Sequence, residues 1–339
     1  MPLMKPLPSI KKYKDACPAP IAVIDVGTNT IRLLVGCVKE GNIVRIATNR
    51  FVTRLGQDLQ KTGRLSTDSI EKSITSILKL KGLCKKYGVK KIIALGTSAL
   101  REAKNSKEFL TDVKKNAGID IEVISGEKEA ELTLKGILPS LHHSIAPFPN
   151  FLLVDIGGGS TEWIYYSEDR EQKTENIQSL NMGSIPIGAV KLFETFVKQD
   201  PPAPWELQLI KDEVKSKVKD HIFRQFTLNF DLNLNLNLVV TGGTATTIAA
   251  IAMSMDEYDG DKIHLHRISL PTIKTIYKKL VALPYDERSK IKGLEPERAD
   301  IIISGTLILL ALMEALNIKE VVVSDYGLLE GAIISYHVL

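Results

Sequence analysis

The stretch from residue 151 to residue 162, FLLVDIGGGSTE, constrains the fold more than any other part of the chain. Its first four residues are apolar and predict a buried strand, which Asp155 ends where a glycine run lets the backbone turn sharply. Without Cβ atoms, backbone N–H groups in such a turn can converge on phosphate oxygens, and hydroxyl groups can add further donors. The predicted phosphate-binding residues of this stretch are Gly157, Gly158, Gly159, Ser160 and Thr161.

Asp155 stands at the mouth of this predicted phosphate cradle. A carboxylate gains nothing from touching phosphate directly, so its position favours a hard cation such as Mg²⁺ that bridges it to the phosphate oxygens. A tight hairpin with a capping aspartate is the purely structural alternative.

The same pattern occurs about 130 residues earlier in the chain. An apolar run from residue 21 to residue 26 contains Asp25 and leads into a second apolar run, residues 31–38. The residues between the two runs supply a glycine, two hydroxyls and an amide: Gly27, Thr28, Asn29 and Thr30. Two phosphate hairpins indicate a duplicated fold with a nucleotide or polyphosphate in a cleft between the halves.

Length and composition fit a soluble two-domain protein. The chain has 339 residues, of which 44% are apolar and 25% charged, and a net charge of only +4. That charge is too weak to indicate nucleic acid. The longest apolar run, residues 301–316, is shorter than the roughly 20 residues that span a bilayer. The N-terminal residues 1–20 are basic and interrupted by prolines, which predicts a loose tail and not a signal peptide.

The three cysteines are widely spaced and form no CxxC pair. This pattern predicts free thiols in a reducing compartment, the cytoplasm, and neither a disulfide framework nor a zinc site. His264 and His266 have no acidic or cysteine partner at ligand spacing, so we do not expect a metal there either.

The order of elements predicts an α/β fold with mixed sheets. Strands over residues 21–26, 31–38 and 43–53 precede a helix capped by Ser66, and a further strand follows at residues 91–95. This β-β-β-α-β order does not suit a plain doubly wound dinucleotide sheet. The proline-containing segment 139–149 is predicted to link domain I, residues 21–138 with about 325–339, to domain II, residues 139–324.

Several local predictions concern the second half of the chain. We expect strands over residues 164–166, 172–180 and 228–240, the last from its Leu/Asn alternation. We expect helices that begin near Gly183 and Pro186, that span residues 206–226, and that run from Pro296 through Ala315.

Three further segments have the form of anion sites or helix starts. GTSALREA, residues 96–103, is a strand-to-helix turn with Arg101 one turn into the helix, and a surface arginine is the alternative. Gly242 and Gly243 follow a strand and open a helix, where a base, a ribose or a chain of phosphates would lie; a close-packed corner is the alternative. Glu129 stands in the first turns of a helix capped by Ser125, where composition alone favours a role in the helix dipole.

Taken together, seven motifs resemble the exopolyphosphatase/guanosine pentaphosphate phosphohydrolase family, which shares the fold of actin, the sugar kinases and the Hsp70 ATPase domain. They are DVGTNTIRLL (25–34), GTSALREA (96–103), ISGEKEAEL (124–132), DIGGGSTE (155–162), MGSIPIGA (182–189), TGGT (241–244) and SDYGLLEG (324–331). The resemblance covers the chain from about residue 21 to its end.

The resemblance implies two ribonuclease-H-like domains with mixed sheets that face a central cleft. It places Asp25, Asp155 and Glu162 at the metal, which would be Mg²⁺ or Mn²⁺. It makes Glu129 the residue that polarises the attacking water, and it assigns substrate phosphates to Arg32 and Arg101. Arg32, Glu129 and Glu162 are therefore the expected catalytic residues.

The expected function is metal-dependent hydrolysis of a terminal phosphoanhydride, on inorganic polyphosphate, on pppGpp to give ppGpp, or on both. A kinase or NTPase of the same fold and a regulator that binds alarmone or polyphosphate without turnover are the alternatives. Leu329 stands where relatives commonly have a basic residue, and the chain ends without the extra C-terminal domains of long members, so a homodimer is left open. We expect no nucleic-acid or membrane partner.

Overall fold

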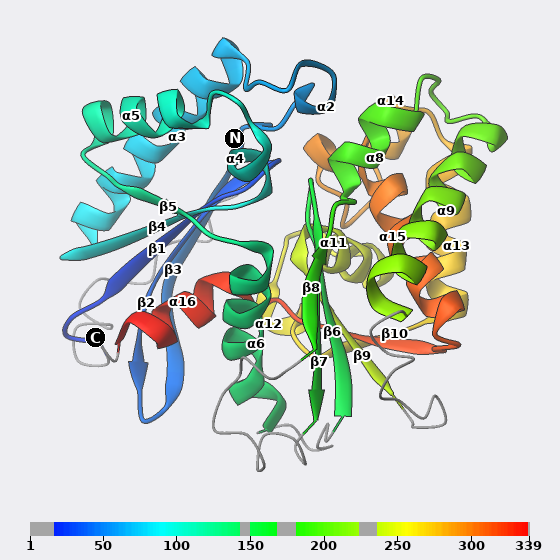
Figure 1. Ribbon diagram of the computed structural model, residues 1–339. Helices are drawn as coiled ribbons and strands as arrows, with labels where there is room; N and C mark the ends of the chain where they lie inside the picture. The colour runs from blue at the N-terminus through cyan, green and yellow to red at the C-terminus, as the bar shows by residue number, and fades with distance from the viewer. Residues whose placement is uncertain (1–16, 143–149, 168–180, 224–235, 338–339) are drawn as a thin grey trace. The chain divides into compact units, whose positions relative to one another are not determined.

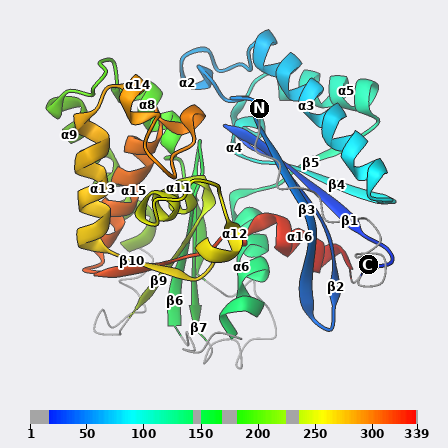
Figure 2. The ribbon, with the colours of Figure 1, turned by 180° about the vertical axis from the view of Figure 1, so that it is seen from behind.

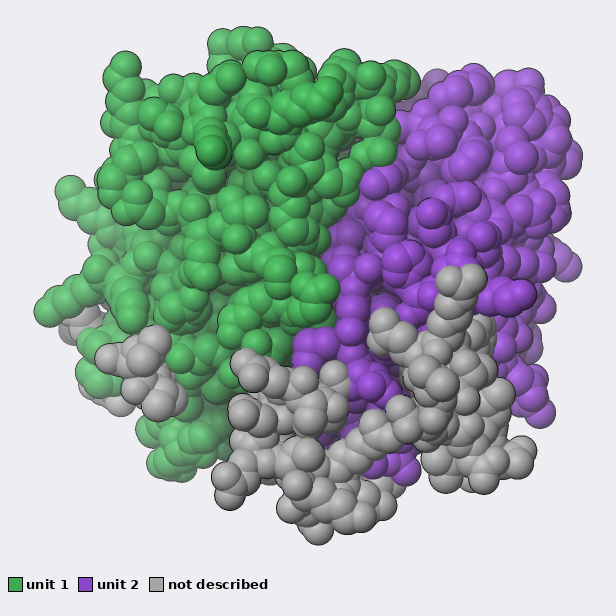
Figure 3. Space-filling model, in the orientation of Figure 1, with its two compact units in different colours: residues 1–143, 326–339 green, residues 144–325 purple. Residues whose placement is uncertain are grey.

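The computed structural model describes residues 17–142, 150–167, 181–223 and 236–337 (Figure 1). The chain divides into two compact units, which Figure 3 colours separately: unit 1 is residues 1–143 with 326–339, and unit 2 is residues 144–325. The predicted strand at residues 172–180, most of the 228–240 strand and residues 1–16 of the predicted tail lie outside the described residues.

Unit 1 is built on a five-stranded mixed sheet in the order β3-β2-β1-β4-β5. Its strands are β1 (Ile21–Val26), β2 (Thr30–Lys39), β3 (Asn42–Val52), β4 (Lys91–Gly96) and β5 (Ile121–Val123). β1, β2 and β3 pair antiparallel, whereas β4 pairs parallel with β1 and with β5. The predicted β-β-β-α-β order and the mixed pairing are therefore confirmed.

Both faces of this sheet are covered, which explains why β1 is apolar at nearly every position. Ala22, Ile24 and Val26 face a core with helices α3 (Thr67–Lys86) and α5 (Ser106–Ala117), and Ile21 and Val23 face the opposite core. Ser66 caps α3 as predicted, since its hydroxyl accepts a hydrogen bond from Ser69 N. The short helices α2 (Leu59–Thr62) and α4 (Ser98–Glu102) complete this side of the unit (Figure 1).

The opposite core is closed by two helices from distant parts of the chain, α6 (Gly126–His142) and α16 (Leu328–His337). They cross at glycines: a Cβ atom on Gly136 would lie 2.0 Å from Gly327 O, and one on Gly331 would lie 1.7 Å from Leu132 O. Leu329, the departure noted in the closing motif, is buried in this core. An apolar residue there serves packing.

Unit 2 repeats the topology of unit 1. Its sheet has the order β10-β11-β9-β6-β7-β8, in which β8-β7-β6-β9-β11 corresponds to the five strands of unit 1 and β10 is added at the edge. The strands are β6 (Asn150–Ile156), β7 (Thr161–Ser167), β8 (Met182–Ile185), β9 (Asn237–Thr241), β10 (His266–Ser269) and β11 (Glu320–Val323). The predicted duplication is confirmed at the level of strand order and direction.

One face of this sheet packs against helices α9 (Pro204–Val218), α11 (Gly242–Ala252), α13 (Leu270–Ala282) and α15 (Ile302–Ala315), which Figure 2 shows from behind. Residues 302–313 of α15 are buried on every side, as is typical of a central core helix. Shorter helical segments are α8 (Ala189–Phe196), a π-helical turn at Lys219–Phe223, α12 (Gly260–Ile263), α14 (Tyr285–Arg288) and a 3₁₀ turn at Pro296–Arg298.

Four sequence predictions about helices are wrong. Helix α6 continues through Pro139 to His142, so the segment expected to link the domains begins later. Residues 182–185 form strand β8 at the sheet edge, and the helix begins only at Ala189. The expected helix over residues 206–226 begins at Pro204 and gives way to π-helical geometry at Lys219, and the one expected over residues 296–315 splits into the 3₁₀ turn and α15.

The cysteine prediction is also wrong in part. Cys17 and Cys37 form a disulfide whose Cα atoms are 6.0 Å apart, while Cys84 is free and buried. Sequence spacing gave no hint of this pair, because the two residues meet only through the folding of β2 back beside β1. Across the described residues, none of the helices combines the length and the apolar character that crossing a membrane requires.

Candidate active site

The two predicted phosphate hairpins have the same geometry. In unit 1 Asp25 pairs across the ladder with Arg32, and in unit 2 Asp155 pairs in the same way with Glu162. Gly27 N donates to Thr30 O at 3.0 Å, and Gly157 N donates to Ser160 O at 3.0 Å. A Cβ atom on either glycine would lie within 3.0 Å of that carbonyl oxygen, so both turns require glycine.

The hairpin of unit 1 joins a carboxylate to a guanidinium. Arg32 donates from Nε at 2.9 Å and from Nη2 at 2.7 Å, both to Asp25 Oδ2. Asp25 is only 3% exposed, and its second oxygen, Oδ1, is buried and accepts no hydrogen bond from the described residues. Arg32 is partly exposed, so its guanidinium is accessible to an anion from solvent.

The turn at residues 27–30 is held from outside by the segment that follows β3. Asn29 O accepts hydrogen bonds from Thr53 N and Arg54 N, and Thr28 O accepts one from Gly56 N at 2.9 Å. These bonds fix the turn through its carbonyl groups. The side-chain amide Nδ2 of Asn29 is buried and makes no hydrogen bond with the described residues, so it remains a donor for a bound oxyanion.

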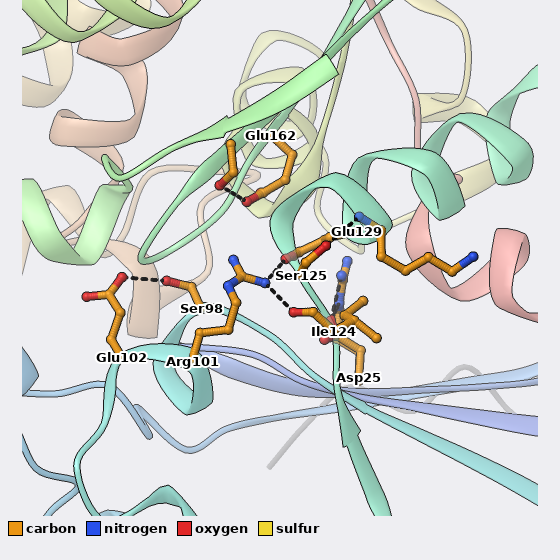
Figure 4. Close-up of polar contacts among 11 residues, drawn as sticks. Asp25, Ser98, Arg101, Glu102, Ile124, Ser125, Glu129 and Glu162 are labelled. Atoms are coloured by element: carbon orange, nitrogen blue, oxygen red, sulfur yellow. Dashed lines mark hydrogen bonds and ion pairs between the residues drawn. The ribbon is translucent and has the colours of Figure 1, made fainter. Parts of the chain in front are cut away.

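Glu129 and Arg101 form an ion pair within unit 1 (Figure 4). Arg101 Nη1, on α4, donates to Glu129 Oε2 at 2.7 Å and to the carbonyl oxygen of Ile124 at 3.0 Å. Glu129 lies in the first turn of α6, and the Ser125 hydroxyl caps that helix by accepting from Lys128 N, as predicted. Glu129 is 8% exposed, whereas Glu127, two residues earlier on the same helix, is exposed.

The hairpin of unit 2 presents two carboxylates side by side. Asp155 is the penultimate residue of β6 and is buried, and Glu162 is the second residue of β7 and is 2% exposed. The Ser184 hydroxyl on β8 donates to Glu162 Oε1 at 2.8 Å (Figure 4). Cross-strand residues have Cβ atoms about 5 Å apart, so two negative charges are held close together here.

The loop at residues 157–160 is braced by the start of α8. Gly158 O accepts hydrogen bonds from Val190 N and Lys191 N, and Gly157 O accepts one from Ala189 N. A Cβ atom on Gly188 would lie 2.4 Å from Gly158 C, so the close approach depends on that glycine. The Thr161 hydroxyl donates to Ile187 O at 2.7 Å, which commits its proton to holding the loop. Gly159 and Ser160 are buried in the same turn.

The third glycine loop lies beside the hairpin of unit 2. β9 pairs parallel with β6, and Gly242 follows it with φ of +88°. A Cβ atom on Gly242 would lie 2.4 Å from Asp155 Oδ1, so the loop and this carboxylate are in contact. Gly242 and Gly243 open α11, whose N-terminal amide groups favour an anion.

Sequence reasoning missed Arg298 as a site residue. Its guanidinium lies on Gly243, since a Cβ atom there would be 2.1 Å from Arg298 Nη1. Arg298 is buried and its Nε donates to Glu295 Oε2 at 2.9 Å. Its position 55 residues after Gly243 in the chain carries no local signal, because only the tertiary fold brings the two together.

The described residues contain no group of three or more His, Cys, Asp or Glu that could hold a metal ion by themselves. Mg²⁺ is usually held by one or two carboxylates, with water and substrate phosphates as the other ligands. In unit 2, the adjacent carboxylates of Asp155 and Glu162 fit that kind of site, and in unit 1 the buried Oδ1 of Asp25 is a candidate ligand by itself. His264 caps the end of α12 and His266 begins β10, so the two histidines do not share one strand.

Each unit thus gathers part of the predicted set. Unit 1 brings together Asp25, Arg32 and the turn residues Gly27, Thr28, Asn29 and Thr30 in one hairpin, and it pairs Arg101 with Glu129. Unit 2 brings together Asp155, Glu162, the loop 157–161 and the Gly242–Gly243 corner.

The sequence similarity to known proteins covers almost the whole chain. It is 33% identical over 96% of its length to a bifunctional 3-dehydroquinate synthase/phosphatase of Fusobacterium nucleatum, of which it covers 47%. It is 31% identical over 93% of its length to exopolyphosphatase 2 of Mycobacterium tuberculosis, of which it covers 98%. A guanosine-5'-triphosphate,3'-diphosphate pyrophosphatase of Vibrio cholerae is 28% identical over 92% of the chain, which covers 58% of that protein.

Solved structures agree with these sequence relationships. The crystal structure of the Aquifex aeolicus member of the Ppx/GppA family matches with a TM-score of 0.73 and 31% identity, over 94% of this chain and 98% of that one. The predicted fold of two α/β units on mixed sheets is therefore confirmed. Residues 34–337 match the Ppx/GppA phosphatase family, and the chain belongs to that family, as its motifs predict.

Proposed function

We propose that this protein hydrolyses the terminal phosphoanhydride bond of a linear phosphate chain, with inorganic polyphosphate as its substrate and pppGpp as a second one. The observation that carries the proposal is the buried Glu129 carboxylate. Its Oε2 lies 2.7 Å from Nη1 of Arg101, and Arg101 belongs to the strand-to-helix turn after β4. This arrangement supplies a fixed carboxylate to orient water next to a guanidinium that binds phosphate.

Hydrolysis of a phosphoanhydride needs an in-line water, a group that orients it, and positive charge on the equatorial oxygens. Glu129 accepts a proton from the attacking water. Arg101 and Arg32 donate to the oxygens of the terminal phosphoryl group, and Asn29 Nδ2 adds a neutral donor from the hairpin turn. No step requires a covalent intermediate.

Unit 2 supplies the remaining phosphate contacts in this proposal. The backbone N–H groups of residues 158–160 and of the Gly242–Gly243 corner bind phosphates, and Arg298 adds a guanidinium beside Gly243. The variants of each unit described below test these contacts independently.

In unit 2, Asp155 and Glu162 would hold a divalent cation, Mg²⁺ or Mn²⁺, and in unit 1 Asp25 is a further candidate ligand. A bound cation would neutralise the phosphate oxygens that these carboxylates otherwise repel. In the proposal, Ser184 keeps Glu162 in place through its 2.8 Å hydrogen bond, and Gly242 sets the position of Asp155.

The names of two relatives support the choice of substrate, since one is an exopolyphosphatase and another a guanosine-5'-triphosphate,3'-diphosphate pyrophosphatase. The test is to incubate the purified protein with Mg²⁺ and medium-chain polyphosphate, pppGpp or ATP, each alone. We expect phosphate release from polyphosphate or pppGpp with no acceptor present.

Two other outcomes would favour the alternatives. Release of phosphate only when an acceptor or ADP is supplied would indicate a kinase of the same fold. Tight binding of polyphosphate or pppGpp with no release over hours would indicate a regulator that binds without turnover.

A further inference from the structure

Arg288 is a buried arginine in a part of unit 2 that holds none of the predicted site residues. Its side chain is 1% exposed and sits at the end of α14. Nη1 donates to Ala299 O at 3.0 Å, and Nη2 pairs with Asp200 Oδ1. Ala299 directly follows Arg298, so Arg288 holds the backbone one residue after the arginine whose guanidinium lies on Gly243.

Tyr285 holds the other end of the 3₁₀ turn Pro296–Arg298. Its hydroxyl donates to Pro296 O at 3.2 Å, and its backbone N–H donates to Asp200 Oδ2 at 2.6 Å. The 3₁₀ turn Pro296–Arg298 is therefore bound on both sides by α14, and α14 is bound by both oxygens of one carboxylate. We call Asp200, Tyr285 and Arg288 the α14 clamp.

The position of Arg298 matters because of where its charge lies. The guanidinium rests on Gly243 at the N-terminus of α11, which carries the positive end of the helix dipole. Two positive charges in contact are unfavourable unless an anion lies beside them; Glu295 supplies one at Arg298 Nε, and a bound phosphate would supply another at the Nη side that faces Gly243. Phosphate recognition by a guanidinium is also geometrically demanding, because its donors form a planar fork.

Stability alone explains Arg288 poorly. Taking the Arg288 guanidinium out of water is costly, and its partner Asp200, at 46% exposure, is screened by solvent and offsets only part of that cost. Arg288 also buries its Nε without a hydrogen-bond partner in the described part of the chain, which adds to that cost. A residue that fixes the geometry of a neighbouring charge accounts for both observations.

We propose that the α14 clamp is a positioning device that holds Arg298 in the orientation needed to bind a substrate phosphate at the Gly242–Gly243 corner. The proposal rests on the function proposed above. Asp200 holds the clamp from outside, since its side chain is 46% exposed and contacts both Tyr285 and Arg288.

The test is a double-mutant cycle on binding, with Asp200→Asn and Arg298→Ala. Asp200 is chosen because it is exposed, whereas a substitution of Arg288 could unfold the protein. All variants carry Glu129→Gln to suppress turnover, and the dissociation constant for medium-chain polyphosphate is measured by calorimetry. Asp286→Asn is the matched control, because Asp286 is an exposed aspartate on α14 itself and its carboxylate has no contact with the clamp.

We expect Asp200→Asn to weaken polyphosphate binding about 5- to 20-fold when Arg298 is present, and to have no further effect in the Arg298→Ala background. Asp286→Asn should leave binding unchanged in both. A merely structural role of Asp200 would lower the melting temperature equally in both backgrounds but would not remove its effect on binding in one of them.

If Asp200→Asn weakens polyphosphate binding equally in both backgrounds, or in neither, the proposed role of the α14 clamp is wrong. An Arg298→Ala variant that binds polyphosphate as well as its parent would also show this role to be wrong. These outcomes are distinct from failure of the proposed function, which is decided by phosphate release from the unsubstituted protein.

Discussion

Arg101 Nη1 lies 2.7 Å from Glu129 Oε2, although the two residues are 28 positions apart and belong to different helices. The same nitrogen donates to Ile124 O, so the guanidinium is held from two directions. The pair combines the residue proposed to orient water with a residue proposed to bind phosphate. A phosphate that takes over donors of Arg101 would loosen its hold on Glu129 at the moment when the carboxylate has to accept a proton.

Glu129→Gln should lower kcat by about 10² to 10⁴ while the fold and the affinity for polyphosphate are retained. The amide keeps the shape of the side chain and an acceptor for Arg101 but is no longer a base. Glu127→Gln is the control, since Glu127 is exposed on the same helix. Equal turnover by both variants and the parent would remove Glu129 from the mechanism.

Arg101→Met and Arg32→Met should each raise KM about 10- to 150-fold, because each removes a charge-assisted phosphate contact worth roughly 1.5 to 3 kcal/mol. Arg64→Met is the control: Arg64 is an exposed arginine of the same unit whose guanidinium pairs with Glu108 on the surface. Steady-state kinetics at low and high salt would measure the effect. A reduced melting temperature with unchanged KM would mean that the two arginines are structural.

Activity should disappear in excess EDTA and return with Mg²⁺ or Mn²⁺, since the adjacent carboxylates of Asp155 and Glu162 would otherwise repel phosphate. Asp155→Asn and Glu162→Gln should each raise the Mg²⁺ concentration needed for half-maximal activity by about tenfold or more. Glu320→Gln, on an exposed carboxylate of the same sheet, should leave this concentration unchanged. Full activity of the EDTA-treated protein would exclude the metal.

The number of thiols that react with a thiol reagent should depend on unfolding and on reduction. Burial raises the pKa of the Cys84 thiol to about 11, so little reactive thiolate exists near neutral pH and Ellman's reagent should find no accessible thiol in the native protein. Unfolding without reductant should expose one thiol, because Cys17 and Cys37 are joined, and reduction should expose all three. Three thiols in the unreduced, unfolded protein would show that the bond does not form.

Glu131 should make unit 1 less stable in acid. Burial acts to raise the pKa of this carboxyl, but hydrogen bonds and charge interactions with Lys135 and Lys128 lower it below 4.5 overall. A depressed folded-state pKa contributes stability above the unfolded-state value, and this contribution is lost as pH falls through the folded-state pKa. Glu131→Gln should therefore cost roughly 0.5 kcal/mol of unfolding free energy at pH 7, and this cost should shrink as the pH falls below 4.5, measured by urea titration.

The parts of the fold that follow local rules could be predicted from the sequence. The turns at Gly27 and Gly157 could be predicted because a carbonyl oxygen approaches each glycine so closely that no side chain fits. The starts of α3 and α6 could be predicted because the hydroxyls of Ser66 and Ser125 at the helix N-termini accept hydrogen bonds from backbone N–H groups. These signals also revealed the repeated hairpin on which the candidate site depends.

The wrong predictions have tertiary causes. The sequence predicts a helix that begins near Gly183 and Pro186, because proline commonly starts one, yet residues 182–185 pair with β7, which extends the sheet and delays the helix to Ala189. The contact of Arg298 with Gly243 and the bond between Cys17 and Cys37 join residues that no periodicity connects. The pairing of Arg101 with Glu129 likewise needs α4 and α6 in place, so the sequence named both residues but not their contact.

The contact between α6 and α16 has a consequence for how the chain is made. The described strands and helices of unit 2 are all synthesised before α16, so unit 1 lacks part of its cover while unit 2 is being made. Val23 and Leu34 are covered by Ala332 and Ile333 only after α16 has been made. Unit 1 thus begins folding first and finishes last, and any nascent chain that stops before Leu328 exposes apolar surface on its oldest sheet.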